Sequence, residues 1–117
     1  MAKKVIAKPQ ADHYLFSVGW SAEDQAFIAR VAEFPSLATH GDTQELALGE
    51  LKQVLMTVLE DLMDSGEPIP VPLGDRTYSG RLNLRMSNYL HRQLAIEAAQ
   101  QGVSLNQVIN LKLASSL

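Results

Sequence analysis

The sequence contains no cysteine among its 117 residues. Disulfides, thiolate metal ligands and cysteine nucleophiles are therefore excluded together. Hydrophobic runs are also short, and none reaches the roughly 18 apolar residues that a membrane-spanning helix needs. The basic start, Met1 to Pro9, lacks the long apolar region of a signal peptide. We therefore expect a cytoplasmic protein with no membrane partner.

Patterns that carry catalysis are equally scarce. The chain has no glycine-rich phosphate loop, and His13, His40 and His91 lack the spacing of metal ligands. Acidic residues such as Glu60 fall on the polar face of a predicted helix, where solvated charge is the simpler explanation. Asp12 and His13 with a distant serine form no known nucleophile motif. We expect no catalytic residue, no metal and no cofactor. A nuclease is therefore the third and weakest of three candidate functions, and the other two are binding functions described below.

Charge is divided unevenly along the chain, whose net charge is −3. Residues 1–76 hold six Lys and Arg against twelve Asp and Glu, a balance of −6. Residues 77–117 hold four against one, a balance of +3. The asymmetry favours a polyanion as the partner of the tail and a basic protein as the partner of the front. The alternative is a chance distribution of solvated charge.

The first part of the chain has the pattern of a small antiparallel meander. We expect strands over residues 13–20 and 26–33, because the first alternates and the second is rich in aromatic and β-branched residues. A third short strand is expected over residues 37–40. The first strand places four large side chains on one face: Tyr14, Phe16, Val18 and Trp20.

A long helix is predicted after the meander. Asp42 to Glu45 has the spacing of a capping box with Asp42 as the N-cap, and Gly66 suits a left-handed C-terminal cap. The helix should cover one face of the meander, because neither element can hide its apolar side alone. A dimerisation seam is the alternative, but the repeat lasts under three heptads. The stripe consists of Leu48, Leu51, Val54, Leu55, Val58, Leu59, Leu62 and Met63.

Prolines and glycines crowd residues 67–80, which favours an extended and semi-rigid path. We therefore predict two domains, residues 1–70 and residues 80–117, joined by a linker over residues 71–79. In the second domain two helices are expected, the first over residues 88–101. Three residues mark the helix ends: Ser87 and Ser104 as N-caps and Gly102 as a C-terminal cap.

Residues 81–86, Arg-Leu-Asn-Leu-Arg-Met, alternate strictly between polar and apolar side chains. This period of two predicts a strand with one face for a core and one for a partner. The outward face carries Arg81, Asn83 and Arg85, whose side chains suit base edges and phosphates. One short strand cannot bury its apolar face alone. We expect it to pair with its copy from a second subunit, which gives a homodimeric two-stranded ribbon for the major groove.

Several segments of the sequence together resemble a known family. The run from Gly80 to Ser87, then Leu90-His91, then Gly102-Val-Ser-Leu-Asn-Gln107 is similar to the ribbon-helix-helix module of HicB-type antitoxins. The front fits the HicB domain through Gly41-Asp-Thr43 before the long helix and Gly66-Glu-Pro-Ile-Pro70 after it. The resemblance implies an α+β fold: a partial ribonuclease-H-like meander with a long helix, followed by a dimeric, Arc/MetJ-like ribbon-helix-helix.

The resemblance also implies a function. HicB-type antitoxins bind and neutralise a HicA-like, mRNA-cleaving toxin of a type II system and repress their own operon at palindromic operator double-stranded DNA. The chain would act as a homodimer, or as a tetramer of two such dimers. A ribonuclease-H-like active site needs clustered carboxylates for Mg²⁺, and the first predicted strand supplies none. The residues implied in DNA binding are Arg81, Asn83 and Arg85 on the ribbon and Ser104, Leu105 and Asn106 at the last helix, whose backbone N–H groups suit a phosphate.

The second candidate function is that of a ribbon-helix-helix transcriptional regulator whose N-terminal domain senses a small ligand. The two readings differ in their partners. An antitoxin gene should lie beside a reading frame for a short basic protein of about 60 residues, as the family pattern implies, whereas a ligand-sensing regulator needs no such neighbour.

Overall fold

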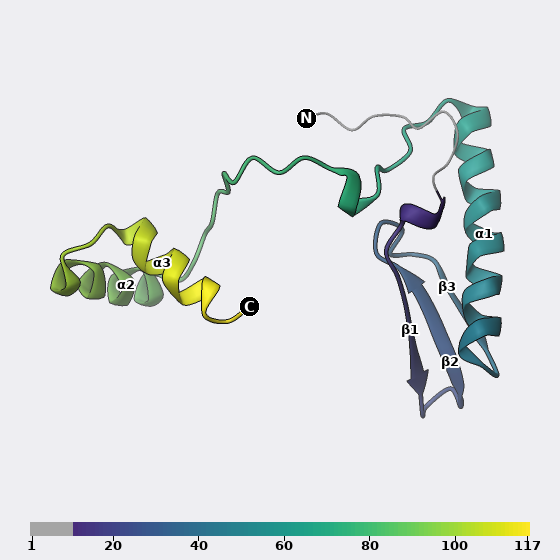
Figure 1. Cartoon of the computed structure of the whole chain (residues 1–117), viewed down its shortest axis with the longest axis horizontal. Coiled ribbons are helices and arrows are strands. Elements are labelled where there is room, and N and C mark those ends of the chain that lie inside the picture. The colour runs from purple at the N-terminus through teal and green to yellow at the C-terminus, as the bar shows by residue number, and fades with distance from the viewer. Residues whose placement is uncertain (1–10) are drawn as a thin grey trace. The chain divides into compact units, whose positions relative to one another are not determined.

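The computed structural model describes residues 11–117 of the chain. The chain divides into two compact units, with the boundary in the sequence between Ser79 and Gly80 (Figure 1). The N-terminal unit combines a three-stranded antiparallel sheet with one long helix, and the C-terminal unit contains two shorter helices. The predicted mixture of helices and antiparallel strands is therefore confirmed.

The sheet has the strand order β1-β2-β3, with β1 over Phe16–Ser21, β2 over Ala26–Val31 and β3 over Ala38–Gly41. Both pairings are antiparallel, as predicted for a meander. Each strand lies within three residues of its predicted range. The predicted first strand starts too early, because Ala11–His13 forms a 3₁₀ helix before it.

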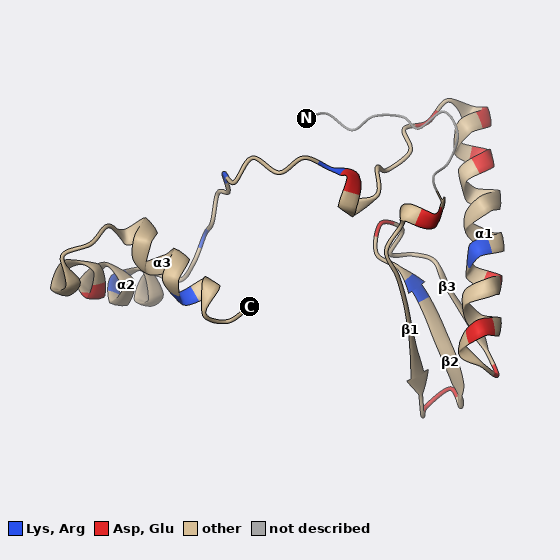
Figure 2. Cartoon of the chain, in the orientation of Figure 1, with Lys and Arg blue, Asp and Glu red and all other residues tan. Residues whose placement is uncertain are grey.

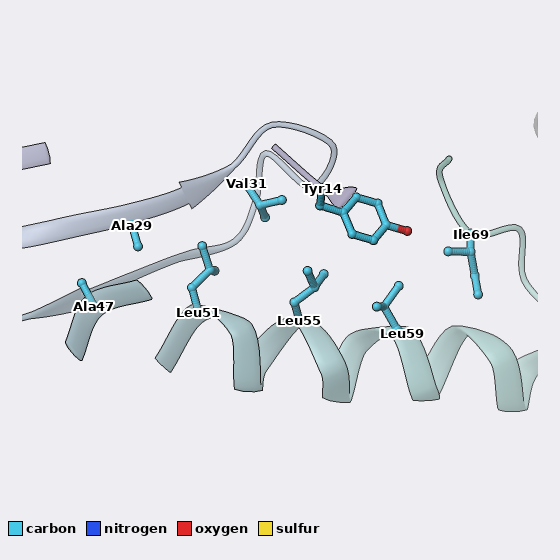
Figure 3. Packing of buried hydrophobic residues seen from close by; sticks show 8 residues of the cluster. All are labelled: Tyr14, Ala29, Val31, Ala47, Leu51, Leu55, Leu59 and Ile69. Atoms are coloured by element: carbon cyan, nitrogen blue, oxygen red, sulfur yellow. The ribbon is translucent and has the colours of Figure 1, made fainter. Parts of the chain in front are cut away.

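The long helix α1, Gln44–Ser65, covers one face of this sheet, which confirms the predicted packing. Figure 3 shows the leucines of α1 in a row that faces Val31, Tyr14 and Ile69. Trp20 was expected on the same face as Tyr14, yet it lies outside this cluster and is 55% exposed. Its ring meets Phe27 edge-on with 5.1 Å between ring centroids. The buried cluster consists of Tyr14, Ala29, Val31, Ala47, Leu51, Leu55, Leu59 and Ile69.

The start of α1 differs from the prediction by one residue. The N-cap is Thr43 and not Asp42: the Thr43 Oγ1 accepts from the Leu46 N–H at 3.1 Å. The strand β3 and the helix meet closely here, since a β-carbon added at Gly41 would lie 2.7 Å from the backbone nitrogen of Ala47. The tight turn places Thr43 at the helix end. The C-terminal cap at Gly66 is confirmed, with φ at 73°.

The chain that leaves α1 stays attached to the N-terminal unit over residues 69–78, which we call the exit segment. Ile69 and Pro72 are fully buried. The Tyr14 hydroxyl donates to the Pro70 carbonyl at 2.7 Å, and the Leu73 N–H donates to the Glu33 carboxylate at 2.8 Å. These contacts lie partly inside the range predicted as a linker. Its proline-rich chain therefore begins as a packed part of the first unit.

Further contacts fix the rest of the exit segment. The His13 Nδ1 and an Asp75 carboxylate oxygen lie 2.7 Å apart, and the Tyr78 hydroxyl donates to the Leu73 carbonyl at 3.0 Å. The Glu33 carboxylate also accepts from the Leu15 N–H at 3.1 Å, so one side chain links the residue before β1 to the exit segment. Burial raises the pKa of Tyr14, and the neighbouring Glu33 charge acts in the same direction.

The C-terminal unit contains α2, Asn88–Gln101, and α3, Leu105–Ala114. The predicted caps are confirmed: Ser87 accepts from the Leu90 N–H, and Gly102 has φ at 70°. The core of this unit is small. It consists of Leu94, Ala98 and Val108, against which Met86, Val103, Leu105 and Ile109 are partly buried.

Candidate nucleic-acid interface

Residues 81–86 are assigned to neither a helix nor a strand in the structure. The apolar side chains of this segment are unequally covered. Met86 packs against the core of the C-terminal unit, whereas Leu82 is 83% exposed and Leu84 is 56% exposed. Leu82 and Leu84 therefore remain exposed, although Met86 of the same segment packs against the core. Pairing with a second copy stays a prediction.

The polar side chains of the same segment, Arg81, Asn83 and Arg85, are all exposed. Two of them line a hollow of about 500 Å³ that also receives Asn106. The structure thus brings Arg81, Asn83 and Asn106 together, while Arg85 and Ser104 are not among the residues that line the hollow. The lining residues are Gly80, Arg81, Leu82, Asn83, Leu84, Asn106, Ile109, Asn110 and Leu113.

The first turn of α3 is closed by a capping box. The Ser104 Oγ accepts from the Gln107 N–H at 3.1 Å, and the Gln107 Oε1 accepts from the Ser104 N–H at 2.9 Å. The side chain of Leu105 packs against the core. At this helix end a phosphate would meet the backbone N–H groups of Leu105 and Asn106, since both polar groups of Ser104 already serve the cap.

Positive charge gathers in the C-terminal unit, where Glu97 is the only carboxylate side chain. The Lys112 Nζ lies 3.1 Å from Glu97, so this pair is neutral overall. The remaining cations of residues 77–117 are three arginines, Arg81, Arg85 and Arg92. Figure 2 shows that acidic residues, in red, are concentrated on the N-terminal unit. The charge division read from the sequence therefore coincides with the division into units.

Sequence reasoning missed the residues of α3 that line the hollow beside the segment. Ile109, Asn110 and Leu113 share its lining with Asn106. Their spacing of three and four residues was the available signal, because such positions fall on one face of a helix. The prediction had treated only the first turn of α3 as functional.

Two kinds of feature are absent from the described part of the chain. Within residues 11–117, no three histidine, aspartate or glutamate side chains gather closely enough to hold a metal ion. None of the helices in this range combines the length and the apolar character needed to cross a bilayer. Of the three histidines, His13 is engaged with Asp75.

Residues 65–113 match the model of the HicB family. The match begins at the last residue of α1 and includes all of α2 and nearly all of α3. It supports a HicB-type protein. No curated protein and no solved structure matches the chain.

Proposed function

We propose that the chain is an antitoxin that neutralises a HicA-like, mRNA-cleaving toxin and represses its own operon. In this proposal the C-terminal unit forms a homodimeric ribbon-helix-helix that binds palindromic operator DNA. The N-terminal unit binds the toxin. The chain acts by binding and carries no catalytic site.

The observation that carries the proposal is the open apolar side of residues 81–86. Leu82 and Leu84 are largely exposed next to a core of only three buried residues. A unit of 38 residues buries too little surface to be stable alone. A second copy that pairs through the same segment would cover both leucines and double the core. The HicB family match over this region supports the same arrangement.

Such a ribbon would present Arg81, Asn83 and Arg85 on its outer side, opposite the leucines. Arginine pairs with guanine and asparagine with adenine in the major groove, whereas the amides at the start of α3 suit a backbone phosphate. Two-fold symmetry of the ribbon requires a palindromic operator. The tetramer stays a further prediction of the same kind.

The acidic N-terminal unit supports a basic protein partner, because opposite charges speed the encounter of two proteins and fix their register. Toxins that act on RNA need a positive surface for their substrate. An antitoxin with a negative surface would compete for that surface. A folded HicA-like toxin of about 60 residues, cytoplasmic like its antitoxin, is the partner that this proposal assigns to the unit.

Co-expression with the small basic protein of the adjacent reading frame tests the proposal. The two proteins should co-purify, and the chain should relieve growth arrest caused by the basic protein alone. The purified chain should also bind DNA from its own promoter region, with an affinity that falls steeply as salt rises.

Each outcome has a distinct meaning. Promoter binding without any partner protein would favour the ligand-sensing regulator. Partner binding with a flat salt response, or with no DNA binding at all, would contradict the operator function. Failure of both interactions would overturn the proposal.

A further inference from the structure

The strand β1 forms one edge of the N-terminal sheet. The strand β1 pairs with β2 alone, and no other strand within residues 11–117 joins it. The Leu15 carbonyl accepts from the Ala32 N–H, so the backbone groups of Leu15 point toward β2. Since these groups alternate along a strand, the N–H and C=O groups of Phe16, Val18 and Trp20 point away from the sheet. They form a row of donors and acceptors along the edge.

The edge lacks the features that normally prevent pairing. Natural sheets protect exposed edges with charged residues, proline, bulges or very short strands. The six residues of β1, Phe-Ser-Val-Gly-Trp-Ser, contain no charge and no proline, and their register with β2 is unbroken. The opposite edge strand, β3, has four residues and carries His40. Of the two edges, β1 is the one built to accept another strand.

Side chains around β1 offer further contacts to an added strand. Trp20 is 55% exposed on the α1 side of the sheet, and Leu15 is 57% exposed on the other side. A hollow of about 310 Å³ on the open face includes Ser17, Gly19 and other residues of β1 and β2. A strand added to a sheet gains affinity from backbone hydrogen bonds and specificity from places for its alternate side chains. The β1 edge provides both.

The charges at the two ends of β1 indicate which kind of strand would bind at this edge. Glu23 and Asp24 lie in the turn after β1, while Asp12 lies before it and Glu33 accepts from the Leu15 N–H. A second copy paired edge to edge in the register centred on Val18 would bring Asp24 of each copy toward Asp12 of the other. Like charges at facing positions oppose this pairing.

Two cations lie near β1. The Lys52 Nζ lies over the Phe16 ring, 5.6 Å from its centroid, and Arg30 is one strand further in, paired with Ser17. Phe16 is the first residue of β1, so Lys52 lies near the end of the edge that also carries Asp12 and Glu33, and no cation is placed near Glu23 and Asp24 among the described contacts. A partner strand flanked by lysine or arginine would meet Asp12 and Glu33 at one end of the edge and Glu23 and Asp24 at the other, four carboxylates against the single Lys52.

We propose that the open edge of β1 is the docking site for an exposed strand of a basic partner protein, which continues the sheet by antiparallel or parallel pairing. The inference rests on the proposed function, because it takes the toxin as that partner. It adds the surface and the mode of binding. The backbone of Phe16, Val18 and Trp20 bonds to the partner, and the carboxylates at the two ends attract its flanking cations.

The test uses the full chain and the small basic protein of the adjacent reading frame. Val18→Pro removes an outward N–H without touching a bond to β2, and should raise the dissociation constant at least about tenfold. His40→Pro is the matched control, because it places the same residue at an outward position of the β3 edge. It should change the constant less than about twofold.

A second pair of variants guards against a folding defect in Val18→Pro. A β-carbon at Gly19 meets nothing within 4 Å, so both Gly19→Lys and Gly19→Glu fit the structure. Their side chains have similar reach and opposite charge. Against a basic partner Gly19→Lys should weaken binding several-fold, whereas Gly19→Glu should bind as tightly as the wild type or more tightly.

Hydrogen exchange of the wild-type complex gives a direct readout. The amides of Phe16, Val18 and Trp20 should become protected when the basic protein binds. If the complex forms and these amides exchange as before, or if all variants bind like the wild type, the docking site is elsewhere and the antitoxin function stands. If the wild type does not bind the basic protein, both proposals fail. If Val18→Pro instead lowers the mass of the chain alone in sedimentation, the occupant is a second copy and the inference is overturned.

Discussion

The two units solve the problem of burying apolar surface in opposite ways. The N-terminal unit closes its core within one chain: eight buried residues from the sheet, α1 and the exit segment form a single cluster. The C-terminal unit buries three residues and leaves Leu82, Leu84 and Tyr89 exposed. One unit thus buries its core within a single chain, whereas the small core and exposed leucines of the other support the proposal that a second copy completes it.

The substitution Leu55→Ala gives the largest expected effect and tests whether the core of the N-terminal unit is closed within one chain. Leu55 has no exposed surface, so the truncation should lower the free energy of unfolding by about 2–5 kcal/mol. Urea unfolding followed by the fluorescence of Trp20, the only tryptophan, reports on this unit. Leu46→Ala, at an exposed position of the same helix, is the control and should cost less than about 0.5 kcal/mol. Equal losses for both variants would contradict the closed core.

The substitution Leu84→Ala tests whether a second copy completes the core of the C-terminal unit. If a second copy covers this side chain, its loss should weaken self-association by about 1–3 kcal/mol, because burying a leucine contributes that much. Sedimentation at several protein concentrations measures the change. Leu46→Ala again serves as the control. A wild-type chain that remains monomeric at micromolar concentration would remove the basis of the comparison.

The functional separation of the units is tested by Asn83→Ala. Loss of one base contact should cost about 1–3 kcal/mol of operator affinity, measured by titration at fixed salt. Binding of the basic partner protein should stay unchanged, since Asn83 belongs to the other unit. A parallel loss of both affinities would show that the units do not act separately.

A smaller effect is expected for Tyr14→Phe, which removes the hydrogen bond to the Pro70 carbonyl. The loss should be about 0.5–1.5 kcal/mol of unfolding free energy. Burial raises the folded-state pKa of Tyr14 above the ordinary tyrosine value of 10.0, so the folded protein holds this proton more tightly than the unfolded chain. Wild-type stability should therefore fall as the pH rises above about 10, toward the folded-state pKa.

The phenylalanine variant should lack this contribution to the alkaline loss. Urea titrations of both proteins at pH 8 and above pH 10 measure the difference. A wild type and a variant with the same slope against pH would show that Tyr14 does not cause it.

Local patterns were enough to predict the helices and their caps in the C-terminal unit. Ser87, Gly102 and Ser104 act through bonds that span three or four residues, so neighbouring sequence determines them. The N-cap of α1 was missed because Asp42 and Thr43 are both good caps. The choice depends on the approach of β3 to the helix, which is a tertiary contact.

The packing of the exit segment on the N-terminal unit could not be predicted from local sequence either, because it also depends on tertiary contacts. Its proline content predicts an extended chain, but Leu73–Asp75 forms a short 3₁₀ helix within it. The bonds from Glu33 to Leu73 and from Tyr14 to Pro70 join residues 40 and 56 positions apart. No periodic signal marks such pairs. Arg81, Asn83 and Arg85 were predicted from alternation, which indicates the face of a strand but not the neighbours on α3 that share the hollow.

The close approach at Gly41 limits the ways in which this fold can diverge. Any residue with a β-carbon at this position would strike the backbone of α1 at Ala47. Descendants of the chain can vary the exposed Asp42 beside it at little cost. At position 41 they must keep glycine, or else lift the helix away from the sheet and open the leucine row to water.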